Sequence, residues 1–266
     1  MTSIRIAIHL LLLLPAAALA HGPGGHPADP NLHVDPSLED CSVVFAPELT
    51  QAAFGRFTRE FGSVSAFKQG SPPTTLGPWG FSLELEQIFF SVEEKSAAWN
   101  DTFAHPDAYH ELGSDKAIPK LRLRVGVTDD LDVGAFYTKS PRANYGWLGL
   151  EAKYAILRQG EDMPVALALR GAYTKTLYVA DMDMHALGAD VSIGRTFWGI
   201  LTPYVGVGGD AVLARETSAA VDLKNELQVV PHLTAGFEVR YWHVAIGAEA
   251  QVSALTSLQA QVSAVF

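Results

Sequence analysis

Residue types that support nucleophilic or acid–base catalysis gather in two polar stretches of the chain. These residues are Asp101, His105, His110 and Ser114 in the first stretch and Asp181, Asp183 and His185 in the second. A covalent hydrolase or transferase needs a nucleophile beside a base, and no Gly-x-Ser-x-Gly elbow or other recognisable spacing joins these side chains. We therefore expect solvated loop histidines and no enzyme.

Metal-binding residue types are also present, in two places. The acidic stretch at 181–185 offers oxygen ligands of the kind that divalent cations prefer, but a solvated loop is the favoured interpretation. His21, His26 and His33 match no compact ligand spacing. Cys41 is the single cysteine and is interpreted as an isolated thiol. We therefore predict neither a metal site nor a cofactor.

A third set of polar residues falls on every second position of apolar stretches. These charged residues are Glu84, Glu86, Arg122, Arg124, Asp132, Glu151, Lys153, Arg170, Asp190, Arg195, Asp210, Glu238, Arg240 and Glu249. Alternate residues of a β-strand point to opposite faces, so each strand would carry its charges on one face. The eight acids and six bases can pair, which makes a buried, salt-bridged charge network the natural arrangement.

The elements that would hold this network are about ten strands between residues 79 and 266. In 120–128, for example, Leu121, Leu123 and Val125 alternate with Arg122 and Arg124. Each stretch is roughly nine to eleven residues long, the length of a tilted strand that crosses a bilayer. The composition agrees, because 48% of residues are hydrophobic and only 18% are charged. A net charge of -10 argues against nucleic acid as a partner.

The N-terminal quarter of the chain differs from this pattern. Residues 1–20 combine Arg5, an apolar run and a small-residue cleavage site, which is typical of a secretory signal peptide. Residues 21–46 are rich in Gly, Pro and His and predict a flexible leader. Residues 47–68 have helical spacing and predict one amphipathic helix. Its phenylalanines suit a charged lumen poorly, so we expect the helix at the mouth of the barrel domain, 77–266, or at the membrane interface.

Two features favour a transmembrane barrel over a secreted or periplasmic β-sandwich. The links between strands alternate between short turns and mostly longer, polar loops, as in barrels with short periplasmic turns. Aromatic residues gather near the strand ends, where two membrane interfaces would lie. These predicted rim aromatics are Trp79, Tyr137, Trp147, Tyr173, Trp198, Tyr204, Tyr241, Trp242 and Phe266.

The last strand carries a more specific pattern. Leu258, Ala260, Val262 and Ala264 alternate on one face, and the chain stops on Phe266. This resembles the C-terminal insertion signal of small Gram-negative outer-membrane β-barrel proteins, although Ala264 stands where many members have an aromatic residue. The resemblance implies an antiparallel, all-β transmembrane barrel in the outer membrane. It also implies outer-membrane lipid, lipopolysaccharide and the barrel-assembly machinery as partners; no oligomeric state is predicted.

For function, the same reasoning favours a narrow small-solute channel or a structural, surface-exposed barrel. Barrels of about eight strands are filled by their own side chains and open channels have about sixteen, so ten strands predict a plugged or narrow lumen. Charged rings would give such a pore its selectivity. An adhesin remains an alternative, as does a lipid-modifying enzyme, because some small outer-membrane barrels are acyltransferases or lipases.

Overall fold

The computed structural model describes residues 32–110, 112–160 and 162–266. The predicted signal peptide and the leader up to residue 31 lie outside the described residues. Ten antiparallel strands close into a barrel, which confirms the predicted fold class and strand number. The barrel strands are β2 (Phe81–Ser91), β4 (Asp115–Gly126), β5 (Leu131–Lys139), β6 (Gly146–Leu157), β7 (Ala166–Leu177), β8 (Met182–Gly194), β9 (Leu201–Glu216), β10 (Glu226–Tyr241), β11 (Val244–Val252) and β12 (Ser257–Val265).

Barrel closure joins the last strand to the first. β12 pairs with β2, so Val262 lies opposite Leu85, and the backbones of Phe81 and Phe266 exchange two hydrogen bonds of 2.9 Å. The rings of Phe81 and Phe266 stack with centroids 4.9 Å apart. The C-terminal residue thus completes the closing seam of the barrel.

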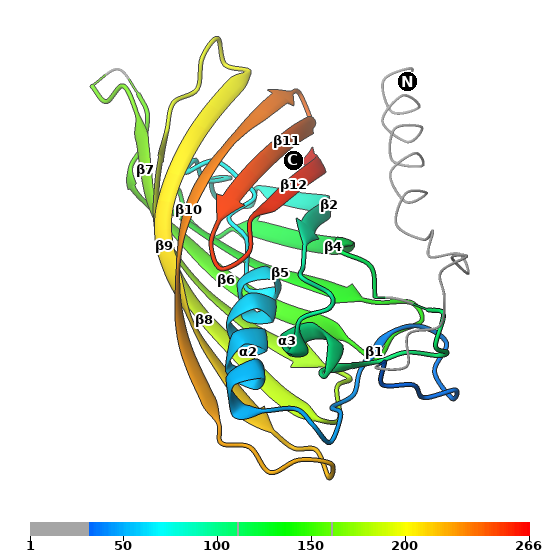
Figure 1. Cartoon of the computed structure of the whole chain (residues 1–266). Helices are drawn as coiled ribbons and strands as arrows, with labels where there is room; N and C mark the ends of the chain where they lie inside the picture. The colour runs from blue at the N-terminus through cyan, green and yellow to red at the C-terminus, as the bar shows by residue number, and fades with distance from the viewer. Residues whose placement is uncertain (1–31, 111, 161) are drawn as a thin grey trace, which may run out of the picture.

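The barrel has two unlike rims. One rim, here called the short-turn rim, holds the turns at 127–130, 158–165, 195–200 and 242–243 and both ends of the barrel sequence. The long-loop rim holds the two longest connections, β2–β4 at 92–114 and β9–β10 at 217–225, together with shorter links at 140–145, 178–181 and 253–256. β9 and β10 have 16 residues each, whereas β11 and β12 have nine, so the wall is uneven in height at the long-loop rim (Figure 1).

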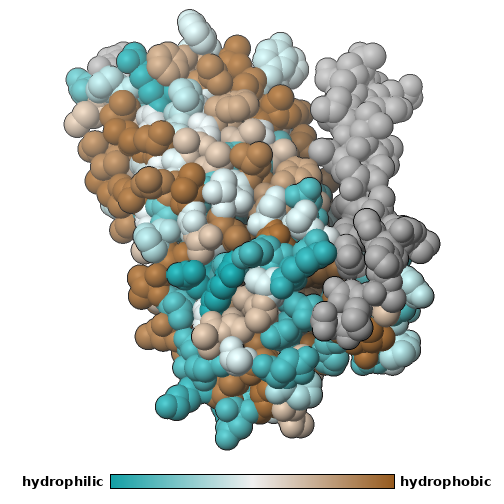
Figure 2. All heavy atoms as spheres, viewed as in Figure 1, coloured by the Kyte–Doolittle hydropathy of each residue, from teal (hydrophilic) through white to brown (hydrophobic). Residues whose placement is uncertain are grey.

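The strands alternate as the sequence predicts. Leu123 and Leu150 point outward and are 47% and 53% exposed, while Arg122 and Glu151 point inward and are 1% and 7% exposed. Figure 2 shows apolar residues gathered on the half of the visible face that carries the short-turn rim, with hydrophilic residues prominent toward the other half. The barrel is therefore apolar outside and charged inside over that half.

Three small elements lie at the long-loop rim, and one helix lies inside the barrel next to this rim. β1 (Ser42–Val43) pairs with β3 (Phe103–Ala104), and α3 (Ala97–Asn100) precedes β3 in the β2–β4 connection. The described part of the predicted leader adds backbone pairs to this connection, since Asp35 N donates to His105 O at 2.8 Å and Val34 forms a bridge with His105. We call residues 32–50 together with 92–114 the cap.

The helix is α2 (Gln51–Ser65), shorter at both ends than the predicted 47–68. Thr50 caps its N-terminus, because its hydroxyl oxygen accepts from Ala53 N at 3.3 Å. The helix ends at Ala66, whose backbone is extended. Neither described helix is long and apolar enough to cross a membrane.

Candidate functional site

The N-terminal part of the chain crosses the barrel from one rim to the other. At the long-loop rim, Gln51 Nε2 donates to Lys224 O at 3.1 Å. At the short-turn rim, Thr75 Oγ1 donates to Asp129 O at 2.7 Å. Between these points run α2 and then residues 66–76, which we call the lumen segment. The chain turns at Gly77 and Trp79 and returns as β2. The expected position of the helix, at the mouth or the membrane interface, is therefore wrong.

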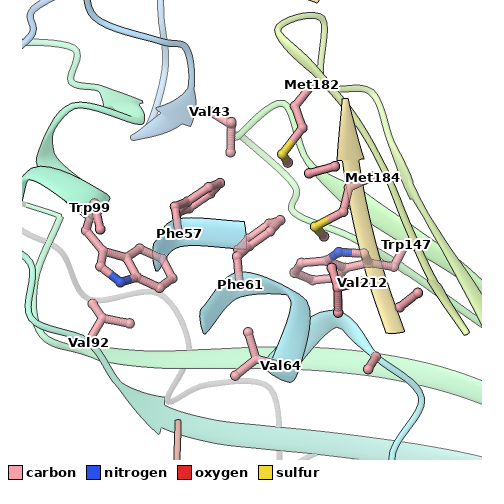
Figure 3. Close-up of a cluster of buried hydrophobic side chains, with 14 of the residues drawn as sticks. Val43, Phe57, Phe61, Val64, Val92, Trp99, Trp147, Met182, Met184 and Val212 are labelled. Atoms are coloured by element: carbon pink, nitrogen blue, oxygen red, sulfur yellow. The ribbon is translucent and has the colours of Figure 1, made fainter. Parts of the chain in front are cut away.

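The half of the lumen next to the long-loop rim is apolar, which explains how it accepts the helix. Phe57 stacks on Phe61 with ring centroids 4.9 Å apart, and Trp99 of α3 meets Phe57 edge-on at 5.3 Å. The wall contributes Trp147, with its ring centroid 5.4 Å from that of Phe61, and the buried Met184 and Val212 (Figure 3). The buried Ala186, Ala214 and Val230 belong to the same cluster. The phenylalanines of α2 therefore face aliphatic and aromatic side chains rather than charges.

One carboxylate is buried inside this apolar half. Glu60 of α2 accepts from the indole nitrogen of Trp99 at 2.6 Å and from Arg56 Nε at 2.7 Å. Arg56 also pairs with Glu93 at 2.7 Å. The interactions with Glu60 and Glu93 raise the pKa of Arg56. These contacts tie α2 to the cap.

The half of the lumen next to the short-turn rim holds a continuous chain of ion pairs along the wall. Lys120 Nζ lies 3.0 Å from Glu86 Oε2, and Glu86 Oε1 lies 3.2 Å from Arg122 Nη1. Arg122 Nε donates to Glu151 Oε1 at 3.0 Å. Arg170 continues the chain, since its Nη1 lies 3.8 Å from Glu151 Oε2. Each acid in this chain is shared between two bases.

The same chain extends at both ends. Arg170 Nη2 lies 2.6 Å from Asp190 Oδ2. Toward the short-turn rim, Arg124 Nη2 pairs with Glu84 Oε1 at 2.7 Å, and Lys153 Nζ lies 3.5 Å from Asp132 Oδ2. All these side chains are buried. These pairs join residues of the wall to one another, so the charges of this chain are compensated within the wall.

The bases of the wall also bind the backbone of the lumen segment. Arg122 Nη1 donates to Gln69 O at 3.0 Å, and Arg170 Nη1 donates to Lys68 O. Lys153 Nζ donates to Thr74 O at 2.7 Å and to Pro72 O at 3.1 Å. These contacts replace the water that extended backbone carbonyls require when buried.

One aromatic ring of the lumen segment lies among the cations. Phe67 has the guanidinium carbons of Arg122 and Arg170 at 4.7 and 5.2 Å from its ring centroid, and Lys120 Nζ at 5.6 Å. On its edge it meets Phe136 of β5, with centroids 4.9 Å apart. Phe67 thus lies at the boundary between the apolar and charged halves, and cation–π attraction stabilises its ring among the wall cations.

The acids of the wall bind the N–H groups of the lumen segment. Glu249 Oε2 accepts from Gly70 N at 2.7 Å and from the Tyr204 hydroxyl at 2.9 Å, and Asp132 Oδ1 accepts from Leu76 N at 3.0 Å. Gly70 has φ +58, and an added Cβ would lie 2.6 Å from Gln259 Nε2. Only glycine meets both the left-handed conformation and the close fit.

The structure brings most of the predicted lumen charges together and leaves two outside. Arg195 and Arg240 are exposed at the short-turn rim, where Arg195 lies 5.1 Å from the ring centroid of Phe197. All the other predicted charged residues are buried on inward faces. Asp210 pairs there with His232, whose Nδ1 lies 3.1 Å from Asp210 Oδ2.

Three further ionisable residues of the charged half were not predicted from the sequence: Lys68, Lys120 and His232. Lys120 stands two positions before Arg122, so the same alternation placed it inside. His232 alternates with outward Leu233 and carried the same signal. Lys68 has no alternating pattern around it that could have placed it, because it lies on the lumen segment, where it hydrogen-bonds to Gln251.

The predicted rim aromatics also fall into two groups, one exposed at the rims and one pointing into the lumen. Trp79, Trp198 and Trp242 are 92%, 84% and 77% exposed at the short-turn rim, and all three have positive φ. Tyr241 and Phe266 are also exposed there, and Tyr137 and Tyr173 are exposed toward the long-loop rim. Trp147 and Tyr204, in contrast, point into the lumen.

The two groups of possible catalytic or cation-binding residues do not assemble as groups. Asp183 and His185 lie on the outer face of β8, with Oδ2 and Nε2 3.2 Å apart. Asp181 turns away and accepts from Phe45 N at 2.7 Å. In the first stretch, Ser114 O accepts from Val92 N at 2.8 Å, and His105 and His110 lie in the cap.

A cavity of about 570 Å³ opens at the short-turn rim beside the lumen segment. Pro73, Thr74 and Thr75 line it together with residues of the β6–β7 turn and Thr196. The closed part of the lumen therefore begins just inside this rim.

Comparisons with known proteins give similarity in structure only. No family model matches the sequence, and no curated protein matches it. Among solved structures, the chain is similar to an outer membrane channel from Pseudomonas putida F1, with 10% identity, 75% of this chain and 100% of that chain covered, and a TM-score of 0.46. It is also similar to KdgM porin, with 8% identity, coverage of 70% and 99%, and a TM-score of 0.36. The attachment invasion locus protein Ail of Yersinia pestis shows 11% identity, coverage of 71% and 97%, and a TM-score of 0.32.

Proposed function

We propose that the protein is an integral outer-membrane β-barrel that serves as a narrow channel closed by its own lumen segment. The single observation that carries the proposal is the passage of residues 66–76 through a charged lumen whose chain of ion pairs, from Lys120 to Asp190, is formed by wall residues alone.

The outer surface supports the membrane part of the proposal. Aliphatic side chains cover the wall, and three exposed tryptophans stand at the turns of the short-turn rim. A positive φ costs a non-glycine residue about 1–2 kcal/mol, and Gly or Asn adopts this conformation with less strain. Trp79, Trp198 and Trp242 nevertheless occupy these strained turns. Indole rings prefer the headgroup level of a membrane, so anchoring of the barrel there explains why tryptophan is present.

The rims support a sidedness. Short turns face the periplasm in outer-membrane barrels and longer loops face outward. With this orientation the cap and the start of α2 lie at the cell surface, and the lumen segment runs inward to the periplasmic rim.

The contacts of the lumen segment support opening. Most of them join wall side chains to backbone carbonyls and N–H groups, which water can replace when the segment leaves. The wall keeps its own pairs, such as Arg122 with Glu151 and Arg170 with Asp190. The open lumen would then be a polar pore that keeps these pairs and has more acids than lysines and arginines on its wall.

Single-channel conductance in planar bilayers tests the proposal. The test variant lacks residues 32–76, which precede the barrel strands and can be removed without cutting the wall. The matched control lacks residues 22–31 only and keeps every described contact. We expect rare or small steps for the full chain and the control, and frequent larger steps for the test variant.

Folding is checked by heat-modifiable migration on a denaturing gel and by recovery in the outer-membrane fraction. If the truncated barrel does not fold, Gly70→Val in the full chain displaces the lumen segment and replaces it as test variant. A folded test variant without steps above background contradicts the channel and leaves a structural barrel. Recovery of the full chain as a soluble periplasmic protein contradicts the membrane barrel itself.

A further inference from the structure

The cap contains a compact cluster of metal-ligating side chains that the channel does not use. Asp40 and Cys41 stand directly before β1, and His105 and His110 follow β3. The Cys41 sulfur lies 3.1 Å from His105 Nδ1, and His110 Nε2 lies 3.3 Å from Asp40 Oδ1. The ligand atoms of Asp40, Cys41 and His110 all lie within 4.8 Å of one another. We call these four residues the cap cluster.

The cap cluster is buried on the side of Cys41 and His105 and accessible to solvent on the side of Asp40 and His110. Cys41 is 6% exposed and His105 is 1% exposed. The side chains of His110 and Asp40 are 19% and 38% exposed. Within the described residues, the buried Nε2 of His105 has no hydrogen-bond partner. A small ion can therefore enter past Asp40 and His110 and reach the sulfur without disturbing the core.

The ligand set selects the class of ion. One thiolate, imidazole nitrogens and a carboxylate are the ligands of tetrahedral zinc, with Zn–S near 2.3 Å and Zn–N and Zn–O near 2.0–2.2 Å. Tetrahedral angles then place ligand atoms roughly 3.3–3.6 Å apart. The distance of 3.3 Å between His110 Nε2 and Asp40 Oδ1 matches these values, and the Cys41 sulfur lies within 4.8 Å of a ligand atom of each of the two residues. Calcium and magnesium take oxygen ligands instead and are disfavoured by Cys41.

We propose that the cap cluster is a Zn²⁺ site, with Cys41, His110 and Asp40 as its ligands and His105 next to the Cys41 sulfur. Binding displaces the thiol proton of Cys41 and leaves a thiolate on the metal. Each ion bound therefore releases one proton to the solvent.

The position of the site suggests its consequence. Asp40 and Cys41 begin the stretch that leads into α2, whereas His105 and His110 belong to the β2–β4 connection. A bound ion would tie these two parts of the cap together over the long-loop rim. This last step rests on the proposed channel, since a fastened cap would also fasten the segment that closes the lumen.

Cobalt titration of the purified, folded, metal-stripped full chain tests the site. Co²⁺ bound to a thiolate gives a sulfur-to-metal charge-transfer absorption that histidines alone do not give. We expect this absorption to saturate at one Co²⁺ per chain and to disappear on addition of Zn²⁺. Cys41→Ser should abolish it, and His110→Ala or Asp40→Asn should weaken binding at least tenfold.

The matched control is His185→Ala, because His185 is also paired with an aspartate but lies on the outer face of β8. This variant should bind Co²⁺ like the unchanged protein. If Cys41→Ser fails to fold, Asp40→Asn replaces it as the test variant, because Asp40 is partly exposed and its substitution leaves the core unchanged. Absence of the charge-transfer absorption in the unchanged protein, or its retention in Cys41→Ser, overturns the proposal. Neither outcome depends on channel activity, so the site and the channel fail separately.

Discussion

The two halves of the barrel have opposite polarity inside. Near the long-loop rim the lumen is apolar and holds a helix, and near the short-turn rim it is charged and holds an extended strand of backbone. The difference follows from what each half must satisfy. A helix bonds its own N–H and C=O groups and can bury phenylalanines, whereas an extended segment needs partners for its backbone. Charged wall residues supply those partners where α2 has ended.

The charged half should fail when one shared cation is removed. Arg122→Met leaves Glu84, Glu86 and Glu151 without a base that all three now contact. Breaking a buried ion pair from one side costs about 3–5 kcal/mol. We expect a loss of this size in the free energy of unfolding in urea, followed by gel migration. A loss below about 1 kcal/mol would mean that the charges of this half do not hold it together.

The apolar half should respond to the loss of volume instead. Phe57→Ala removes a fully buried ring that touches Phe61, Trp99 and Phe103. Such truncations cost about 3–5 kcal/mol, at the lower end where the site can collapse. The control is Leu227→Ala, because Leu227 points outward and is 66% exposed. Equal effects of the two variants on unfolding would contradict an apolar core at this rim.

The lumen segment should be sensitive to one methyl group. Gly70→Ala places a Cβ against Gln259 and Arg122 at a residue with φ +58. The strain of a non-glycine residue in that region is about 1–2 kcal/mol. We expect more frequent channel openings and slightly lower stability. Gly171→Ala is the control, since nothing lies within 4 Å of its added Cβ; openings in both variants alike would show that position 70 is not special.

The smallest effect is expected outside the lumen. Trp198→Asn relieves a positive φ of 53 at the short-turn rim and removes an exposed indole. In detergent the stability should rise by at most about 1 kcal/mol, since asparagine tolerates this conformation. In lipid vesicles the barrel should insert more slowly, because an interfacial anchor is lost. Unchanged insertion would remove the anchoring explanation for the strained turns.

The contrast between the halves also shows how far sequence reasoning reaches. Alternation identified ten strands and their faces, because a strand with period two reveals its own two sides. The same alternation argues against a position on the outer surface for two of the predicted rim aromatics. Leu148 and Val205 point outward, so their neighbours Trp147 and Tyr204 must point into the lumen. Arg195 and Arg240 were misplaced because they stand at strand ends, where the wall no longer encloses them.

The position of α2 and of the lumen segment was not predictable in this way. Helical spacing in 47–68 states that one face is buried but not what covers it. The wall residues that cover it, such as Met184 and Val212, come from strands more than a hundred residues away. Nor does the extended stretch 66–76 have any periodicity of its own, because its partners are Arg122, Arg170 and Glu249 rather than a neighbouring strand.

The reversal potential of the truncated barrel in a salt gradient tests this account most directly. Without residues 32–76, the charged half is lined by eight acids, Glu84, Glu86, Asp132, Glu151, Asp190, Asp210, Glu238 and Glu249, and by five lysines and arginines, Lys120, Arg122, Arg124, Lys153 and Arg170. Excess negative charge in a narrow pore favours cations. We predict a cation-selective potential for the truncated barrel and, for the full chain, too little current to define one. A full chain that already conducts with the same selectivity would contradict closure of the lumen by residues 66–76.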